Sequence, residues 1–134
     1  MLKWAAPAAL LAVFFLQSFL SSRIKSATFD EPAHIAAGLS YVSTGVFHAN
    51  PQHPPLMKEL SGLSLLLGGV RWPATPNAKD IIANPPGKTT GRDWEAGKEI
   101  FAAYGIDRVL LWARFPMILT GVFLGLMIYL WTIR

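Results

Sequence analysis

The sequence contains no cysteine and few charged residues, and each shortage excludes a class of site. Without cysteine, neither a disulfide framework nor a thiolate metal site can form. Only 15% of the 134 residues are charged, whereas a soluble domain normally carries about 25%. The formal net charge of +4 comes from scattered lysines and arginines and not from a basic tract, so nucleic-acid binding is not indicated. An ordinary soluble domain is therefore not expected.

Apolar residues gather near both ends of the chain. The first run, Trp4 to Leu20, would extend about 26 Å as a helix, which is near the lower limit for crossing a bilayer. Arg23 and Lys25 follow it and can reach into the membrane interface. A cleaved secretory signal is the alternative, but cleavage after Ala27 would place Lys25 where a small residue is required. We therefore predict a first transmembrane helix over 1–22.

A second apolar run predicts another transmembrane helix, over 108–134. Gly121 and Gly125 form a G-x-x-x-G pattern, which permits the close approach of another helix. Arg114 is an unusual charge inside this run. It either extends to the near interface, or faces a polar cavity and pairs with an anion or with a loop carboxylate.

The loop over 23–107 is longer than about 60 residues, so its basic residues do not determine on which side of the membrane it lies. Helix-start and helix-stop residues predict three helices in it, over about 30–44, 55–70 and 93–104. We expect the first to be amphipathic and to lie along the membrane surface, and the second to be interfacial or re-entrant. The segment 72–92 is rich in Pro, Asn and Gly and is predicted to be irregular.

Together these runs predict an all-α membrane protein in which two transmembrane helices are joined by a long loop with amphipathic, surface-lying helices. Within that loop, Asp30 and Glu31 place two carboxylates at a predicted helix N-terminus, either as helix caps or as functional groups. His53 and Lys58 flank the start of the next predicted helix, where the backbone N–H groups favour an anion.

The histidines and carboxylates of the loop do not match a known metal signature. His34, His48 and His53 lie near Asp30 and Glu31, but their spacings differ from standard ligand sets such as H-E-x-x-H. We therefore predict no metal site, and no divalent metal cofactor is indicated. The sequence also lacks a Ser/His/Asp arrangement and a Gly-rich loop that could hold phosphates.

Three motifs occur in order along the chain: TFDEPAHIAAGLSY after the first span, NPQHPPLMKELSGL in the loop, and WARFP at the start of the second span. This combination resembles the N-terminus of GT-C type membrane glycosyltransferases, which use polyprenyl-phosphate sugars and include protein O-mannosyltransferases and the aminoarabinose transferase of lipid A. The resemblance covers nearly the whole chain. It implies the first part of a GT-C fold in the inner (plasma) membrane, multi-pass, with the loop 23–107 extracytoplasmic.

The resemblance also implies roles for individual residues. Asp30 would be the catalytic base that activates the acceptor, with Glu31 assisting it. His53 would contact the phosphate of the lipid-linked sugar donor, and Lys58 and Arg114 are further candidates for that contact. Removal of the acceptor proton by a carboxylate and stabilisation of the departing phosphate by cations are physically reasonable steps.

Members of this family have many more spans. We therefore expect further transmembrane helices, encoded beyond residue 134 or on another chain, to complete the donor cavity, and we expect this chain alone to be inactive. Membrane lipid and the polyprenyl-phosphate sugar are the expected partners. The alternative is a non-catalytic two-span membrane protein whose loop binds a partner or lipid headgroups. A secreted protein with a cleaved signal and a C-terminal tail anchor is a third interpretation.

Overall fold

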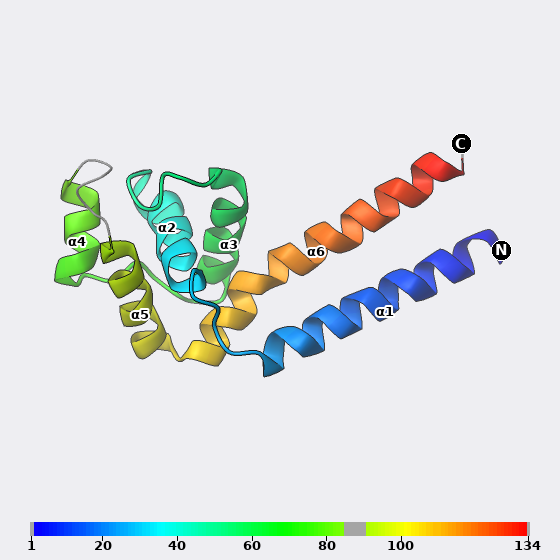
Figure 1. Ribbon diagram of the computed structural model, residues 1–134, viewed down its shortest axis with the longest axis horizontal. Helices are drawn as coiled ribbons and strands as arrows, with labels where there is room; N and C mark the ends of the chain where they lie inside the picture. Colours follow the sequence, from blue (N-terminus) through cyan, green and yellow to red (C-terminus); the bar gives the residue numbers. More distant parts are fainter. Residues whose placement is uncertain (1, 85–90, 134) are drawn as a thin grey trace.

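The computed structural model describes residues 2–84 and 91–133, and these residues form six α-helices and no strand. The two longest helices lie side by side, with both chain ends at one end of the pair (Figure 1). The other four helices form a compact head at the opposite end (Figure 1). We call the long pair, α1 (Leu2–Ile24) and α6 (Ile106–Thr132), the paired helices. The head comprises α2 (Glu31–Thr44), α3 (Pro55–Leu67), α4 (Pro76–Ala83) and α5 (Arg92–Tyr104), with their connections.

The paired helices are long and apolar enough to cross a membrane. A core helix of a soluble protein would be mostly buried, but none of the apolar window of α1 and only 22% of that of α6 is buried within the protein. Leu10, Leu16 and Leu20 on α1, and Phe123 and Ile128 on α6, are among the large apolar side chains left exposed. Apolar surface of this extent is typical of contact with lipid. The all-helical architecture with two candidate spans agrees with the predicted fold class.

The G-x-x-x-G pattern of α6 is where α1 packs. A Cβ atom at Gly121 would lie 2.8 Å from the Phe14 ring, and one at Gly125 would lie 2.8 Å from a methyl group of Leu11. The two glycines therefore leave room for the side chains of α1, as the pattern predicts. Near the far end of the pair, the rings of Trp4 and Tyr129 meet edge to face, with centroids 5.2 Å apart.

Helix α2 is the centre of the head. It packs against α3 on one side and α5 on another, and Ile35 and Leu39 are buried in a core that also includes Leu65 and Ile100. Because α3 and α5 cover it on two sides, α2 is a largely buried helix, and its predicted position along the membrane surface stays a prediction. Small residues at 33, 36, 37 and 38 allow both neighbours to approach closely.

Three glycines make these close approaches possible. A Cβ atom at Gly38 would lie 2.1 Å from the carbonyl oxygen of Lys58, and one at Gly62 would lie 2.2 Å from that of Gly38. On the α5 side, a Cβ atom at Gly97 would lie 2.2 Å from the carbonyl oxygen of Pro32. These atoms belong to the backbone and cannot move aside as a side chain could, so the helix crossings require glycine.

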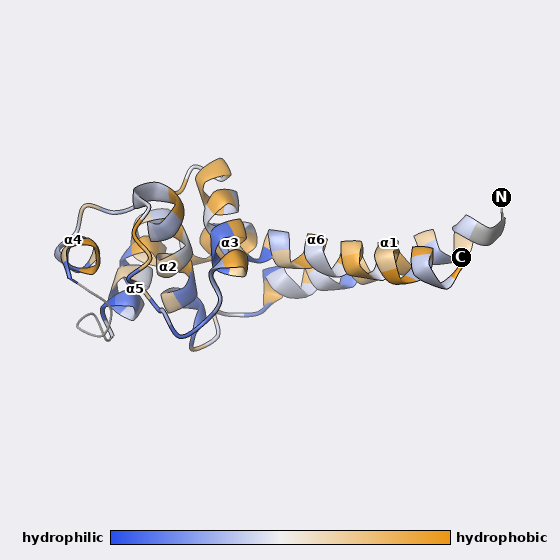
Figure 2. Ribbon diagram, turned by 90° about the horizontal axis from the view of Figure 1, so that it is seen from above, coloured by the Kyte–Doolittle hydropathy of each residue, from blue (hydrophilic) through white to orange (hydrophobic). Residues whose placement is uncertain are grey.

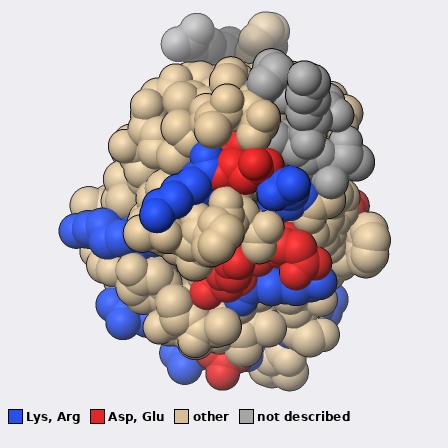
Figure 3. All heavy atoms as spheres, turned by 90° about the vertical axis from the view of Figure 1, so that its left-hand side faces the viewer, with Lys and Arg blue, Asp and Glu red and all other residues tan. Residues whose placement is uncertain are grey.

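The surface of the head differs between its sides. α3 leaves Leu56, Leu63 and Leu67 exposed, whereas strongly hydrophilic segments elsewhere in the head contrast with the largely apolar paired helices (Figure 2). On the face farthest from the paired helices, acidic and basic side chains lie next to one another (Figure 3). Within the head, Arg92 of α5 forms an ion pair with Asp80 of α4, at 2.8 Å.

One helix was not expected. The prediction that 72–92 is irregular is wrong for Pro76–Ala83, which forms α4. The Thr75 hydroxyl accepts a hydrogen bond from the Ala78 amide, and Pro76 occupies the first turn, where it fits a helix. Ile81 then anchors α4 in the core of the head. Residues 85–90 of the segment lie outside the described residues.

The glycine crossing of α2 and α3 gives a test of this packing. We expect Gly38→Val to lower the free energy of unfolding by about 3 kcal/mol, at the upper end of the range for overpacking, because the added atoms meet backbone. The matched control is Ser43→Val on the exposed side of the same helix. Thermal unfolding in detergent measures both variants, and equal stability of the two would contradict the proposed crossing.

Candidate functional site

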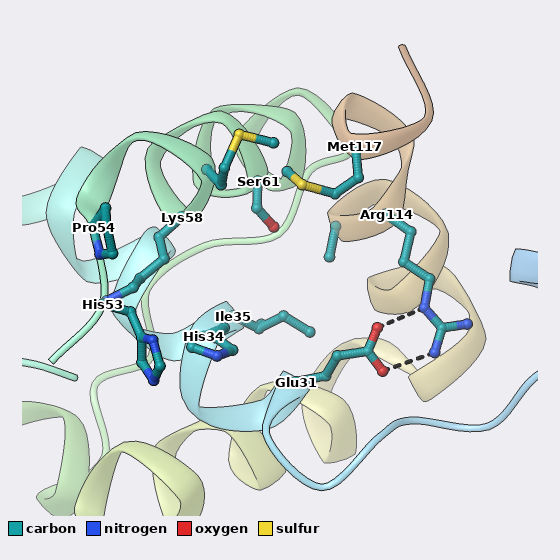
Figure 4. Close-up of a pocket in the computed structure, with 11 residues that line it drawn as sticks. Glu31, His34, Ile35, His53, Pro54, Lys58, Ser61, Arg114 and Met117 are labelled. Atoms are coloured by element: carbon teal, nitrogen blue, oxygen red, sulfur yellow. Dashed lines mark hydrogen bonds and ion pairs between the residues drawn. The ribbon is translucent and has the colours of Figure 1, made fainter. Parts of the chain in front are cut away.

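A cavity of about 390 Å³ opens where α2, α3 and α6 meet. Its walls are mostly apolar and include Ile35, Pro54, Ala113 and the methionines Met57 and Met117. The ionisable groups fall into two sets: the histidines and lysine on one side, and the Glu31–Arg114 pair on the other (Figure 4). The cavity therefore combines an apolar interior with two separate polar ends, beside the start of a candidate membrane span.

Arg114 connects three parts of the chain. Its Nε and Nη2 atoms donate to the two carboxylate oxygens of Glu31, at 2.6 and 2.7 Å. The remaining donors reach the backbone carbonyls of Ser22, Lys25 and Ser26, at 2.8 to 2.9 Å. A guanidinium group has five N–H donors, so all five are used within the chain. Of the alternatives for Arg114, pairing with a loop carboxylate is the one observed. Arg114 has no N–H donor left for a phosphate.

Glu31 is correspondingly engaged. Besides Arg114, its carboxylate accepts a hydrogen bond from the Thr28 amide, at 2.7 Å. Burial alone would raise the pKa of Glu31, but the hydrogen bonds from Arg114 and Thr28, with the charge of Arg114, outweigh burial and lower it. Glu31 is therefore a charged residue that fixes the start of α2 to α6 and to the end of α1. This geometry favours positioning over a direct part in proton transfer.

Asp30 differs from its neighbour. It is exposed, it precedes α2, and its side chain makes no capping hydrogen bond. Within the described part of the chain, it also forms no ion pair. Asp30 thus occupies the N-cap position of α2 without using its carboxylate as a cap. Asp30 does not line the cavity, but its negative charge acts on His34, one turn further along α2. Of the two predicted carboxylates, Asp30 is the one whose oxygens remain accessible.

Lys58 and His53 lie on the opposite side of the cavity from the Glu31–Arg114 pair (Figure 4). Lys58 is only 4% exposed, and its ammonium group donates to the carbonyl of Asn50 and lies 3.4 Å from the Tyr41 hydroxyl. Burial lowers the pKa of Lys58, an effect that the charge of Asp93 partly opposes. His53 is exposed at the edge of the cavity. The structure thus brings His53 and Lys58 to one cavity, which Arg114, the third predicted phosphate contact, also lines.

His34 belongs to the same group, although it was not among the site residues expected from the sequence. Its ring meets that of His53 edge to face, with centroids 5.1 Å apart, and its Nδ1 atom is buried without a hydrogen-bond partner. Burial, followed by the positive charges of Lys58 and His53, lowers the pKa of His34. The sequence could have indicated His34 as a site residue, because it lies four residues after Asp30 and so on the same helix face.

A buried polar atom without a partner is costly. The His34 ring lines the cavity, but its Nδ1 atom is buried and is not accessible to a ligand there. No group of three or more histidine, aspartate and glutamate side chains in the described part of the chain is arranged to hold a metal ion.

Comparison with known proteins gave no further guidance. A scan against models of protein families, a search of curated proteins and a search of solved structures found no match to this chain.

The Glu31–Arg114 pair predicts a specific dependence of stability on pH. Because the pKa of Glu31 is lower in the folded state than in the unfolded state, its stabilising effect is complete above about pH 4.3, the ordinary glutamate value, and is lost as the pH falls through the folded pKa. We expect Glu31→Gln to lower the free energy of unfolding by about 2 kcal/mol at neutral pH, less than for a fully buried pair. The difference from wild type should shrink as the pH falls.

Thermal unfolding in detergent across the acid range measures this effect. The control is Glu95→Gln, because Glu95 pairs with Lys98 on an exposed surface where such pairs contribute little. An unchanged stability of Glu31→Gln at neutral pH would exclude the assigned role.

Proposed function

We propose that this chain is the N-terminal part of a GT-C type membrane glycosyltransferase, and that its cavity receives the phosphate of a polyprenyl-phosphate sugar. One observation carries the proposal: an apolar-walled cavity beside a candidate membrane span has an amine and two imidazoles at one side. A lipid-linked phosphate requires both features, because its prenyl chain is apolar and its phosphate is anionic.

The phosphate would lie against Lys58, His53 and His34. An ammonium group has three donors, and Lys58 has two acceptors within the chain, the Asn50 carbonyl and the Tyr41 hydroxyl. A third donor is thus left for a ligand. Lys58 and His53 both disfavour the charged form of His34, and an anion would offset this repulsion, which supports a negatively charged occupant. The two methionines of the wall are flexible and can adapt to a prenyl chain.

Asp30 would serve as the general base. The acceptor hydroxyl gives its proton to the Asp30 carboxylate as its oxygen forms a bond to the anomeric carbon of the sugar. The bond from that carbon to the phosphate oxygen breaks, and polyprenyl phosphate leaves with the electron pair. Its growing negative charge is stabilised by Lys58 and His53. Glu31 and Arg114 hold the start of α2, and with it Asp30, in place.

The alternative, a non-catalytic two-span protein whose loop binds a partner or lipid headgroups, differs in what the cavity must bind. It needs no preference for a polyprenyl phosphate, and it gives Asp30 no chemical role. The following two experiments separate these proposals.

Binding of polyprenyl phosphate tests the cavity. We expect Lys58→Met, which keeps the length of the side chain, to weaken the binding of a short-chain polyprenyl phosphate about tenfold or more, because a hydrogen bond to a charged group is lost. Native mass spectrometry of the protein in detergent measures the bound fraction. Since Lys58 is buried, the exposed His53→Ala variant is measured as well and should also weaken binding. The matched control is Lys98→Met on the surface of α5. Equal binding by all four proteins would refute the proposed phosphate site.

Transfer activity tests Asp30. In membranes from cells that contain the chain and its natural partners, we expect Asp30→Asn to reduce sugar transfer from a labelled polyprenyl-phosphate sugar at least about 100-fold, because general-base catalysis contributes this much. The thermal stability of the variant should not change, because the Asp30 side chain makes no capping hydrogen bond. Undiminished transfer by Asp30→Asn, where wild type is active, would exclude it as the base and favour the non-catalytic alternative.

A further inference from the structure

A second cavity lies where the paired helices join the head. It has a volume of about 260 Å³ and lies between the end of α1 and the start of α6. This is below the range of about 300–1,000 Å³ that is usual for pockets that enclose a whole small molecule. A single headgroup fits such a space better than a complete ligand does.

The cavity is lined mainly by positive charge. Arg23 and Lys25 come from the last turn of α1 and the residue after it, and Arg108 comes from the first turn of α6. Asp107 is the only acidic residue in the lining. Within residues 2–84 and 91–133, no ion pair joins any of these four side chains to another residue. Three cations thus surround the cavity without a carboxylate paired to them.

The ends of the two helices also favour an anion here. The exposed carbonyls at the C-terminus of a helix normally repel anions, but those of Ser22, Lys25 and Ser26 accept hydrogen bonds from Arg114. The opposite end of the cavity lies at the start of α6, where the helix dipole is positive. Arg108 is held in place by a hydrogen bond of 2.7 Å from Nη2 to the carbonyl of Gly68, with its other donors left over.

The position of the cavity indicates which anion it binds. Leu110 and Leu111 form its apolar part, and the exposed apolar surfaces of α1 and α6 begin directly beside it. The acyl chains of a lipid can lie along these surfaces while its headgroup enters the cavity. Basic pockets between membrane helices are a known mode of binding anionic headgroups.

We propose that the cavity formed by Arg23, Lys25 and Arg108 binds the headgroup of an anionic phospholipid. This site is separate from the cavity of His34 and Lys58 and does not depend on the proposed transferase activity. It places one lipid at the junction that Arg114 holds together, so the lipid stabilises the attachment of the head to the paired helices.

Lipid retention tests the proposal. The protein is placed in nanodiscs of phosphatidylglycerol and phosphatidylcholine in equal amounts. Native mass spectrometry then measures which lipid remains bound after the protein is released from the nanodisc. We expect wild type to retain one phosphatidylglycerol preferentially. In Arg23→Gln/Lys25→Gln the preference should fall about tenfold or more, because each basic residue near a membrane surface contributes about 1 kcal/mol. The matched control, Lys79→Gln/Lys98→Gln, loses the same charge in the head and should keep the preference.

Three outcomes would overturn the inference. Wild type could retain both lipids equally, which would mean that the basic residues only anchor the helices at the membrane interface. The control could lose the preference as fully as the test variant, which makes the effect one of net charge. Finally, soluble glycerol phosphate could displace the retained lipid at millimolar concentration, which makes the site one for a free phosphate. Retention that depends on Arg23 and Lys25 and resists glycerol phosphate supports the lipid site.

Discussion

The contact between Arg114 and Glu31 determines how the head is attached to the paired helices. A single guanidinium group joins α6 to the start of α2 and to three carbonyls at the end of α1. A charge inside an apolar helix is expensive unless it is fully paired, and here the pairing is complete. A planar guanidinium fixes direction as well as distance. The contact that compensates the charge of Arg114 therefore also sets the angle between α2 and the paired helices. The cavity lined by His34 and Lys58 depends on that angle, because α2 forms one of its walls.

Small residues provide the second constraint. α2 can be crossed by α3 and α5 at very short range only because Gly38, Gly62 and Gly97 carry no side chain. The close crossing with α3 brings Lys58, on one helix, near Tyr41 on the other. The cavity of His34 and Lys58 is thus defined by two kinds of contact, the close helix crossings at glycine and the Glu31–Arg114 ion pair. It is this combination that places imidazoles and an ammonium group in an apolar enclosure.

The sequence predicted the positions of the helices better than their burial and their contacts. The two apolar runs and the helix signals of the loop correspond to α1, α6, α2, α3 and α5, because length, hydropathy and capping residues are local properties. α4 was missed although Thr75 and Pro76 are good starting residues, since the surrounding Pro, Asn and Gly outweighed them. The burial of α2 could not be read from its periodicity, because its covering helices lie far along the chain. For Arg114, the sequence predicted a loop carboxylate as one of two possible partners. Only the fold shows that this carboxylate is Glu31 and that the neighbouring Asp30 stays exposed.

The crowding of positive groups around His34 links ligand binding to protons. Burial and the charges of Lys58 and His53 lower the pKa of His34. An anion beside the ring would remove part of that repulsion and raise the pKa again. By linkage, binding of an anion is then accompanied by uptake of protons from water, and its departure by their release. If the cavity binds an anion as proposed, its affinity would rise as the pH falls, and the acidity of the compartment that the head faces would then affect binding.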